Sequence, residues 1–378
     1  MQEELDKLYE TYKDFYYIYI GTNDYETQIN DITDIIRDEY YDHYYGVSGS
    51  WMMPLAGVKS KLKTITLYDY NPLMLFVYNF IYFVISISED RKKFIENLFS
   101  RSIKKDILSN EDVLEYLDQP IEEEIKNKLK EKLKNHQDNR VKIALSFMNK
   151  FYDNLIVGGD RIVYPSFFWD GKTFEFNSKK FRSQNKDVQI FTTFYYNIVY
   201  CFKHDKYYDN LKRILSETPI SYKHIDINKI SSNFFPNNDK ILMYISNIDL
   251  KYPIYLNMHR DEFHKKIQNI VKQNDNEYIH ILSTNTYLTK IKKQSINYKS
   301  NSNYKDISKK GYNKILKENK KKRYIGKKVE QEDIKLIEKI FDKEVSKNNK
   351  LNEIEETGYK HLYKKYKKKY LNLKNEKN

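Results

Sequence analysis

Apolar and polar positions alternate in two different ways along the first 289 residues. Short runs with β-branched and aromatic residues are typical of strands, whereas apolar residues three or four positions apart are typical of helices. The strand-like and helix-like runs follow one another, which predicts an α/β fold with a mainly parallel sheet covered on both faces. Strands are expected at 15–21, just before a loop at 46–49, up to position 69, and at 222–228, 240–248 and 278–284. Helices are expected at 25–42, 207–217 and 261–273.

The most apolar part of the chain is the uncharged run at 70–88, which reads YNPLMLFVYNFIYFVISIS. Its length is close to the lower limit for a membrane span, but the run contains Asn71, Pro72 and Asn79. We interpret it as a buried helix and expect no transmembrane span. A long helix-rich segment follows, and we expect it to form a helical insertion at about 85–205.

The positive charge of the chain is concentrated near its C-terminus. The whole sequence has a formal net charge of +13, and positions 290–328 alone hold 15 Lys or Arg residues against Asp306 and Glu318. This segment is poor in apolar residues and rich in Ser, Asn and Lys, which is typical of a solvated segment. We therefore predict that the globular domain ends at about residue 289.

Two amphipathic helices are predicted after the basic segment. Apolar residues at helical spacing define one face of each helix. These residues are Ile334, Ile337, Phe341 and Val345 in the first helix, and Leu362, Tyr366, Tyr370 and Leu373 in the second. The expected organisation is an N-terminal segment at 1–43 packed on the core, the domain at 44–289, a basic linker at 290–328 and C-terminal helices at 329–378.

Several kinds of chemistry lack their sequence patterns. The single cysteine, Cys201, excludes an internal disulfide and a cysteine-built zinc site and suits a reducing compartment, so we expect a cytoplasmic protein. His259 and His264 are five positions apart, which does not place both on one helix face, and we expect no metal site. No phosphate-binding loop of the G-x-x-x-x-G-K-[ST] type occurs. A hydrolase with Ser48 or Ser50 as its nucleophile stays an open alternative, although the sequence lacks the second glycine of the usual elbow.

The clearest candidate site begins in the sequence YYGVSGSWMMPLAG at 44–57. In open α/β sheets, ligands bind beyond the carboxyl ends of the strands, where glycine allows close approach and an acid after the second strand accepts hydrogen bonds from ribose. The loop would comprise Gly46, Ser48 and Gly49, and Asp69 follows Gly49 by 20 positions. The strict G-x-G-x-x-G pattern is absent, so a nucleoside ligand without phosphates, such as S-adenosylmethionine (SAM), fits the loop better than a dinucleotide.

Polar residues at later strand ends complete this site. Asp226 ends one predicted strand, where its carboxylate could meet the adenine amino group, and Ser246 and Asn247 end the next strand, where a substrate would lie. Each of these residues is equally typical of an ordinary turn. Their order along the chain is what favours a SAM-type site.

These motifs resemble those of class I SAM-dependent methyltransferases, which have a Rossmann-like fold. The D-x-N-P sequence at 69–72, the helical insertion ending in FIENLFSR, the WDGK segment and the later YISNI are also similar to SAM-dependent 3-amino-3-carboxypropyltransferases. The resemblance covers 44 to about 285 and implies a SAM-dependent transferase of methyl or aminocarboxypropyl groups. The resemblance implies that Gly46, Gly49, Asp69, Asn71 and Asp226 bind the cofactor. It also implies that Ser246 and Asn247 face the substrate.

The basic regions support a second hypothesis of another class. Lysines interleaved with tyrosines could follow a phosphate backbone while the tyrosines stack on bases, or could attract an anionic membrane surface. The regions are 290–328 and 359–378, and the candidate residues are Lys292, Lys293, Lys320, Lys321, Lys322, Arg323, Lys327 and Lys328. The alternative function is therefore a non-catalytic nucleic-acid-binding or virion scaffold protein. The C-terminal tail resembles Lys-rich and Tyr-rich tails of giant-virus proteins, which implies a viral origin and a location in the host cytoplasm or the virion.

Overall fold

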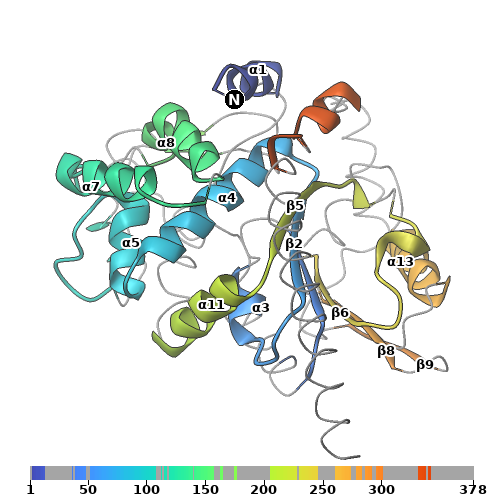
Figure 1. Cartoon of the computed structure of the whole chain (residues 1–378). Coiled ribbons are helices and arrows are strands. Elements are labelled where there is room, and N and C mark those ends of the chain that lie inside the picture. Colours follow the sequence, from blue (N-terminus) through green and yellow to red (C-terminus); the bar gives the residue numbers. More distant parts are fainter. Residues whose placement is uncertain are drawn as a thin grey trace, which may run out of the picture.

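A computed structural model gives the fold of the chain (Figure 1). The structure describes residues 2–12, 36, 39–47, 52–107, 112, 115–116, 119–138, 140–156, 162–164, 174–176, 205–227, 230–245, 260–273, 278–282, 286–291, 295–300, 331–337 and 339–341. Predicted features outside these ranges include the strand at 15–21 and the last helix at 361–375. Most of the predicted helix at 25–42 also lies outside; of its described residues, Ile36 is helical and residues 39–42 are not.

A seven-stranded sheet with the order β5-β2-β1-β6-β7-β8-β9 forms the centre of the fold. The first five strands in this order are parallel, and β8 and β9 continue the sheet in antiparallel pairs. The parallel strands follow the chain in the order third, second, first, fourth, fifth, which is the doubly wound order. The predicted Rossmann-like α/β fold is confirmed. The strands are β1 (His43–Val47), β2 (Thr64–Asp69), β5 (Ile220–His224), β6 (Lys240–Tyr244), β7 (Tyr278–Leu282), β8 (Thr286–Ile291) and β9 (Ser295–Ser300).

Helices cover both faces of the parallel strands. On one face lie α3 (Met52–Gly57), α4 (Pro72–Ile87) and α11 (Asp205–Glu217), and on the other lies α13 (Arg260–Gln273) with the 3₁₀ helix η2 (Ser232–Phe234). Successive strand residues point to opposite faces. Tyr44 of β1 accordingly packs in the core below α4, whereas Tyr45 packs in the core below α13.

The predicted buried helix at 70–88 is confirmed as α4. Asn71 accepts a hydrogen bond from the backbone N–H of Leu73 at 3.0 Å, and Pro72 occupies the first helical position, a combination that favours helix initiation. Almost the entire length of α4 is buried, because strands lie on one side and inserted helices on the other. Within the described residues, no helix has the length and apolar character needed to cross a membrane.

Between β2 and β5 the chain builds the inserted layer seen at the left of Figure 1. It consists of α5 (Arg91–Phe99), α7 (Glu123–Lys134), α8 (Val141–Ile156) and a small hairpin of β3 (Ile162–Tyr164) and β4 (Phe174–Phe176). The helices pack on α4 through one continuous apolar core. This placement agrees with the helical insertion expected at about 85–205.

The sheet extends beyond the predicted domain end at residue 289. That boundary falls inside β8, and β9 occupies part of the predicted basic linker. Lys, Asn and Ser are compatible with strands at the edge of a sheet, where charged residues limit pairing with other chains. A polar composition therefore did not distinguish these edge strands from a linker.

The two ends of the described chain meet on the core. Helix α1 (Gln2–Tyr12) buries Leu5, Leu8 and Tyr12, and residues 331–337 and 339–341 form a helix that buries Ile337 and Phe341. The predicted apolar face of the helix at 331–341 is confirmed for Ile337 and Phe341, and Ile334 is partly buried beside them. Helix 331–341 therefore belongs to the folded core rather than to a separate extension.

Candidate functional site

The direction of the sheet connections changes between β1 and β6. The chain proceeds from β1 to β2 and β5 on one side, and then crosses to β6 and β7 on the other side of β1. In open α/β sheets, the crevice at the carboxyl ends of the strands on either side of such a switch point is the usual ligand site. The topology therefore places a candidate site beyond Val47 of β1 and Tyr244 of β6.

Gly46 was expected in the loop of this site, and the structure corrects that position. Gly46 lies inside β1, where it is paired with Leu67 of β2 and Tyr244 of β6. The strand continues to Val47 because the apolar and aromatic residues around Gly46 are buried on both faces of the sheet. Ser48 and Gly49, the other two predicted loop residues, lie outside the described residues.

Asp69 is the last residue of β2, as the sequence predicted for the acid at a strand end. Its carboxylate is largely buried, with Oδ1 accepting the backbone N–H of Asn71 at 2.9 Å and Oδ2 accepting the hydroxyl of Tyr78 at 2.7 Å. These two bonds hold the carboxylate in one orientation. Asp69 and Asn71 thus also organise the turn from β2 into α4.

The end of β5 lies directly beside Asp69. His224 is paired with Asp69 across the two strands, and the N–H of Ile225 donates to the carbonyl oxygen of Asp69 at 3.0 Å. His224 Nε2 donates to the carbonyl oxygen of Tyr70 at 2.8 Å, which fixes the β2 turn from the other side. Asp226 follows, half-buried, so the structure brings two predicted acids to neighbouring strand ends.

Tyr68 connects β2 with the far side of the switch point. Its hydroxyl donates to the carbonyl oxygen of Tyr244 at 3.3 Å, and burial raises the pKa of Tyr68 well above its ordinary value. The hydroxyl is therefore neutral and acts as a structural donor. Ser246 and Asn247, the predicted substrate-facing residues, follow β6 but lie outside the described residues.

Sequence reasoning missed Tyr78, Tyr70 and His224. Tyr78 looks like any aromatic residue in an apolar helix, and only the packing of α4 against β2 brings its hydroxyl to Asp69. His224 belongs to a predicted strand, but its partner became apparent only from the strand register. No local motif indicates either contact.

A polar cluster at the amino ends of the strands, away from the candidate site, was also not predicted. His43 Nδ1 lies 2.7 Å from Thr64 Oγ1, and His43 Nε2 lies 3.0 Å from Asp239 Oδ2. Lys63 Nζ lies 2.5 Å from Asp239 and 3.0 Å from Asp42, and its ammonium, followed by His43, holds the pKa of Asp239 below its usual value. The cluster joins the amino ends of β1, β2 and β6.

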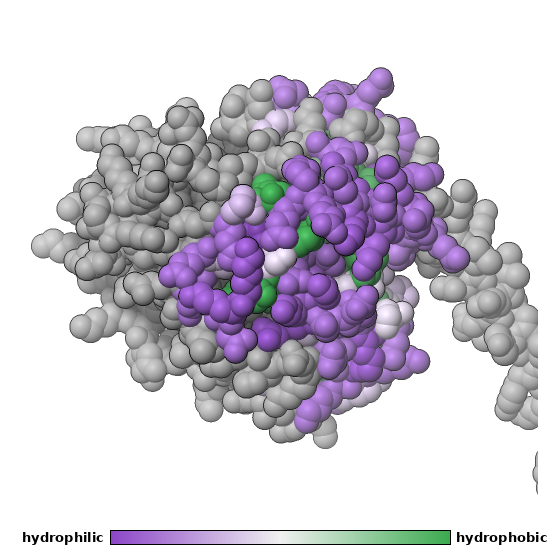
Figure 2. Space-filling view, turned by 90° about the vertical axis from the view of Figure 1, so that its left-hand side faces the viewer, coloured by the Kyte–Doolittle hydropathy of each residue, from purple (hydrophilic) through white to green (hydrophobic). Residues whose placement is uncertain are grey.

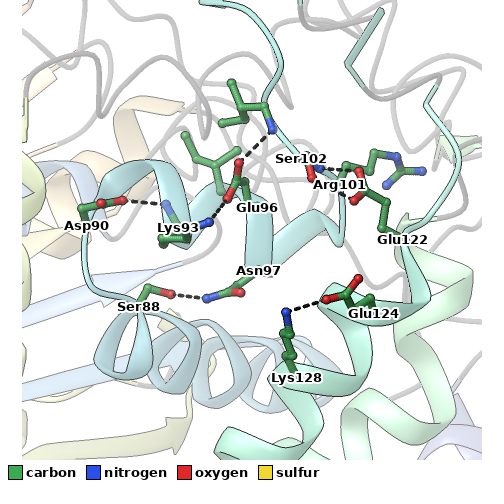
Figure 3. Close-up of polar contacts among 12 residues, drawn as sticks. Ser88, Asp90, Lys93, Glu96, Asn97, Arg101, Ser102, Glu122, Glu124 and Lys128 are labelled. Atoms are coloured by element: carbon green, nitrogen blue, oxygen red, sulfur yellow. Dashed lines mark hydrogen bonds and ion pairs between the residues drawn. The ribbon is translucent and has the colours of Figure 1, made fainter.

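Polar residues of the inserted layer mainly satisfy backbone groups (Figure 3). Asp90 caps α5 by accepting the N–H of Lys93 at 2.7 Å, and Glu122 accepts both the N–H and the hydroxyl of Ser102. Glu96 accepts the N–H of Ile103 and pairs with Lys93. The described surface on this side of the molecule is mainly hydrophilic, with small separate apolar spots (Figure 2). These contacts give the polar residues of the inserted layer a structural role.

A surface hollow of about 490 Å³ lies between the η2 segment and α13. It is lined by Ile230, Ser231, Glu262, Lys265, Lys266, Asn269 and Ile270. None of the residues predicted for the SAM-type site lines it. The hollow is on the α13 face of the sheet, whereas Asp69 and Tyr78 lie on the α4 face.

Two further predictions concern metal and nucleic acid. In the described part of the chain, no three His, Cys, Asp or Glu side chains are placed to hold a metal ion. The eight basic residues named as nucleic-acid contacts all lie outside the described ranges. No protein-family model and no curated protein matches the sequence.

Proposed function

We propose that this chain is a SAM-dependent transferase, moving a methyl or aminocarboxypropyl group, with its cofactor at the carboxyl ends of β1, β2 and β5. The observation that carries the proposal is the position of Asp69. It is a buried carboxylate at the end of the strand next to the switch point, held in one orientation by Tyr78 and Asn71. An acid in this position is suited to accept hydrogen bonds from ribose hydroxyls.

The charges at this edge favour a nucleoside over a nucleotide. Asp69 and Asp226 lie at neighbouring strand ends, where two carboxylates disfavour a phosphate and favour a cationic ligand. The helix after β1, α3, has only six residues. The described residues thus fit an adenosyl group bearing a positive charge better than a dinucleotide.

The residues of the chain would bind and orient rather than transfer protons. A sulfonium cofactor supplies an activated substituent, so the protein mainly has to align donor and acceptor and exclude water. Asp69 would accept the ribose hydroxyls, and Tyr78 and Asn71 would keep its carboxylate in place. Asp226 would accept the amino group of adenine.

Calorimetric titration with SAM, S-adenosylhomocysteine and ATP tests this proposal. The wild-type protein is expected to bind the first two ligands saturably and ATP at least about tenfold more weakly, because phosphates approach two carboxylates. Asp69→Asn keeps an acceptor for the Asn71 N–H and is expected to lose most of the affinity. Asp239→Asn makes the same chemical change at the amino ends of the strands and serves as the control.

The titration has two outcomes that would reject the proposal. Absence of SAM binding to folded wild-type protein would exclude the cofactor and favour the non-catalytic nucleic-acid-binding alternative. Equal affinities for the wild-type protein and Asp69→Asn would place the ligand elsewhere.

A further inference from the structure

Helix 331–341 packs beside the candidate site together with α1. The hydroxyl of Tyr12 donates to Asp333 Oδ2 at 2.7 Å, and both residues are buried. Lys339 Nζ lies 3.6 Å from Glu4 Oε1 at the surface of the same contact. In Figure 1 the orange-red helix accordingly lies near α1 at the top of the molecule, close to one end of α4.

Phe341 joins this helix to two elements of the site. Its side chain is 1% exposed, its ring stacks on Tyr222 of β5 with a centroid distance of 4.7 Å, and it lies 5.2 Å from the ring of Phe76 in α4. A single aromatic residue from the C-terminal part of the chain therefore contacts both β5 and the beginning of α4.

These two elements also hold Asp69. Two residues after Tyr222, His224 donates to the carbonyl oxygen of Tyr70. Two residues after Phe76, Tyr78 donates to the carboxylate of Asp69. The turn that carries Asp69 thus lies between the two elements against which Phe341 packs.

We propose that helix 331–341 is a latch whose docking positions the Asp69 turn for ligand binding. When the helix is docked, β5 and the first turns of α4 are held at a fixed separation, and the Asp69 carboxylate keeps its orientation. When it is undocked, Phe76 and Tyr222 lose their shared partner and the turn becomes more mobile. The effect on a ligand rests on the proposed function, whereas the effect on the turn does not.

The form of the helix suits a reversible latch. Helices in proteins are stabilised mainly by packing of their apolar face rather than by intrinsic propensity, so the order of this helix depends on docking. Among its described residues, Ile337, Ile340 and Phe341 are the buried apolar ones, and Ile334 and Leu336 are partly buried against the same core. Positions 301–330 separate it from β9 in the sequence, so the helix stays tethered after it undocks, and tethering favours redocking through a high effective concentration.

Hydrogen exchange of the full chain tests the latch directly. Phe341→Ala is expected to speed amide exchange about tenfold or more at 70–78 and at 2–12, while exchange in β7 stays as in the wild type. Lys335→Ala, an exposed substitution on the same helix, is the matched control and should change neither region. Phe341→Leu keeps much of the apolar volume and should exchange more slowly at 70–78 than Phe341→Ala.

Ligand affinity is the second readout. Phe341→Ala is expected to weaken SAM binding about fivefold or more while keeping a cooperative unfolding transition. Faster exchange confined to 331–341, with 70–78 unchanged, would overturn the proposal. If wild-type protein binds no SAM, the proposed function fails, and exchange at 70–78 alone decides the latch. Should Phe341→Ala prevent folding, Asp333→Asn, which weakens only the contact with Tyr12, gives the same comparison.

Discussion

Substitution of Asp69 by alanine should destabilise the fold as well as weaken ligand binding. The change removes the acceptor of the Tyr78 hydroxyl, which is fully buried, and the acceptor of the Asn71 N–H. A hydrogen bond to a charged group contributes about 1.5–3 kcal/mol, and a buried donor left without a partner costs about 1–3 kcal/mol. We expect Asp69→Ala to lower the free energy of unfolding by about 3 kcal/mol, a large part of the total for an ordinary domain.

A double-mutant cycle isolates the contact between Asp69 and Tyr78. Urea unfolding of the wild type, Asp69→Ala, Tyr78→Phe and the double variant should give a coupling energy of about 1.5–3 kcal/mol with unchanged m-values. Tyr78→Phe keeps the carboxylate of Asp69, so it should bind SAM more weakly but still saturably. A coupling energy below about 0.5 kcal/mol would refute the reasoning, because the two groups would then not share a buried charge-assisted bond.

Two pH-dependent effects and one effect of lost hydrogen bonds are expected at His280, Asp239 and Arg101. Burial lowers the pKa of His280 to about 4. As the pH falls below about 6.5, the unfolded chain takes up a proton that the folded chain does not, so the free energy of unfolding should fall by up to about 3 kcal/mol between pH 6.5 and pH 4. His280→Gln should flatten this part of a curve of urea midpoint against pH. The pKa of Asp239 is held below its usual 3.8, so its contribution is present above that value and lost at more acidic pH, and Asp239→Asn should flatten the curve only below about pH 4. Arg101 is fully buried and donates to the carbonyl oxygens of Gln119 and Phe99, so Arg101→Met should cost about 3 kcal/mol in unfolding experiments, whereas the exposed Lys92→Met should cost almost nothing.

Features that depend on local pattern could be predicted from the sequence. The uncharged run at 70–88 has the length and composition of a buried helix, and the N-P pair at its start matches the cap and first turn of α4. Asp69 follows an apolar run, so its place at a strand end was visible. The apolar spacing at 334–341 likewise identified the face that the C-terminal helix buries.

Features that depend on tertiary contacts could not be predicted. The residues around Gly46 are compatible with both a loop and a central strand, and only its pairing with β2 and β6 places it in β1. The polar residues of β9 look solvated because an edge strand needs little apolar surface. The bond between Tyr78 and Asp69 and the stack of Phe341 on Tyr222 depend on how the elements meet, which periodicity does not report.

Hydrogen exchange with and without saturating SAM tests the central claim most directly, because it reports both binding and location. The account predicts that SAM slows amide exchange at 69–78 and 224–227, at the carboxyl ends of β2 and β5. Exchange in α13 and at the surface hollow beside it should stay unchanged. Protection confined to the hollow, or no protection anywhere in folded protein, would contradict a cofactor site at Asp69.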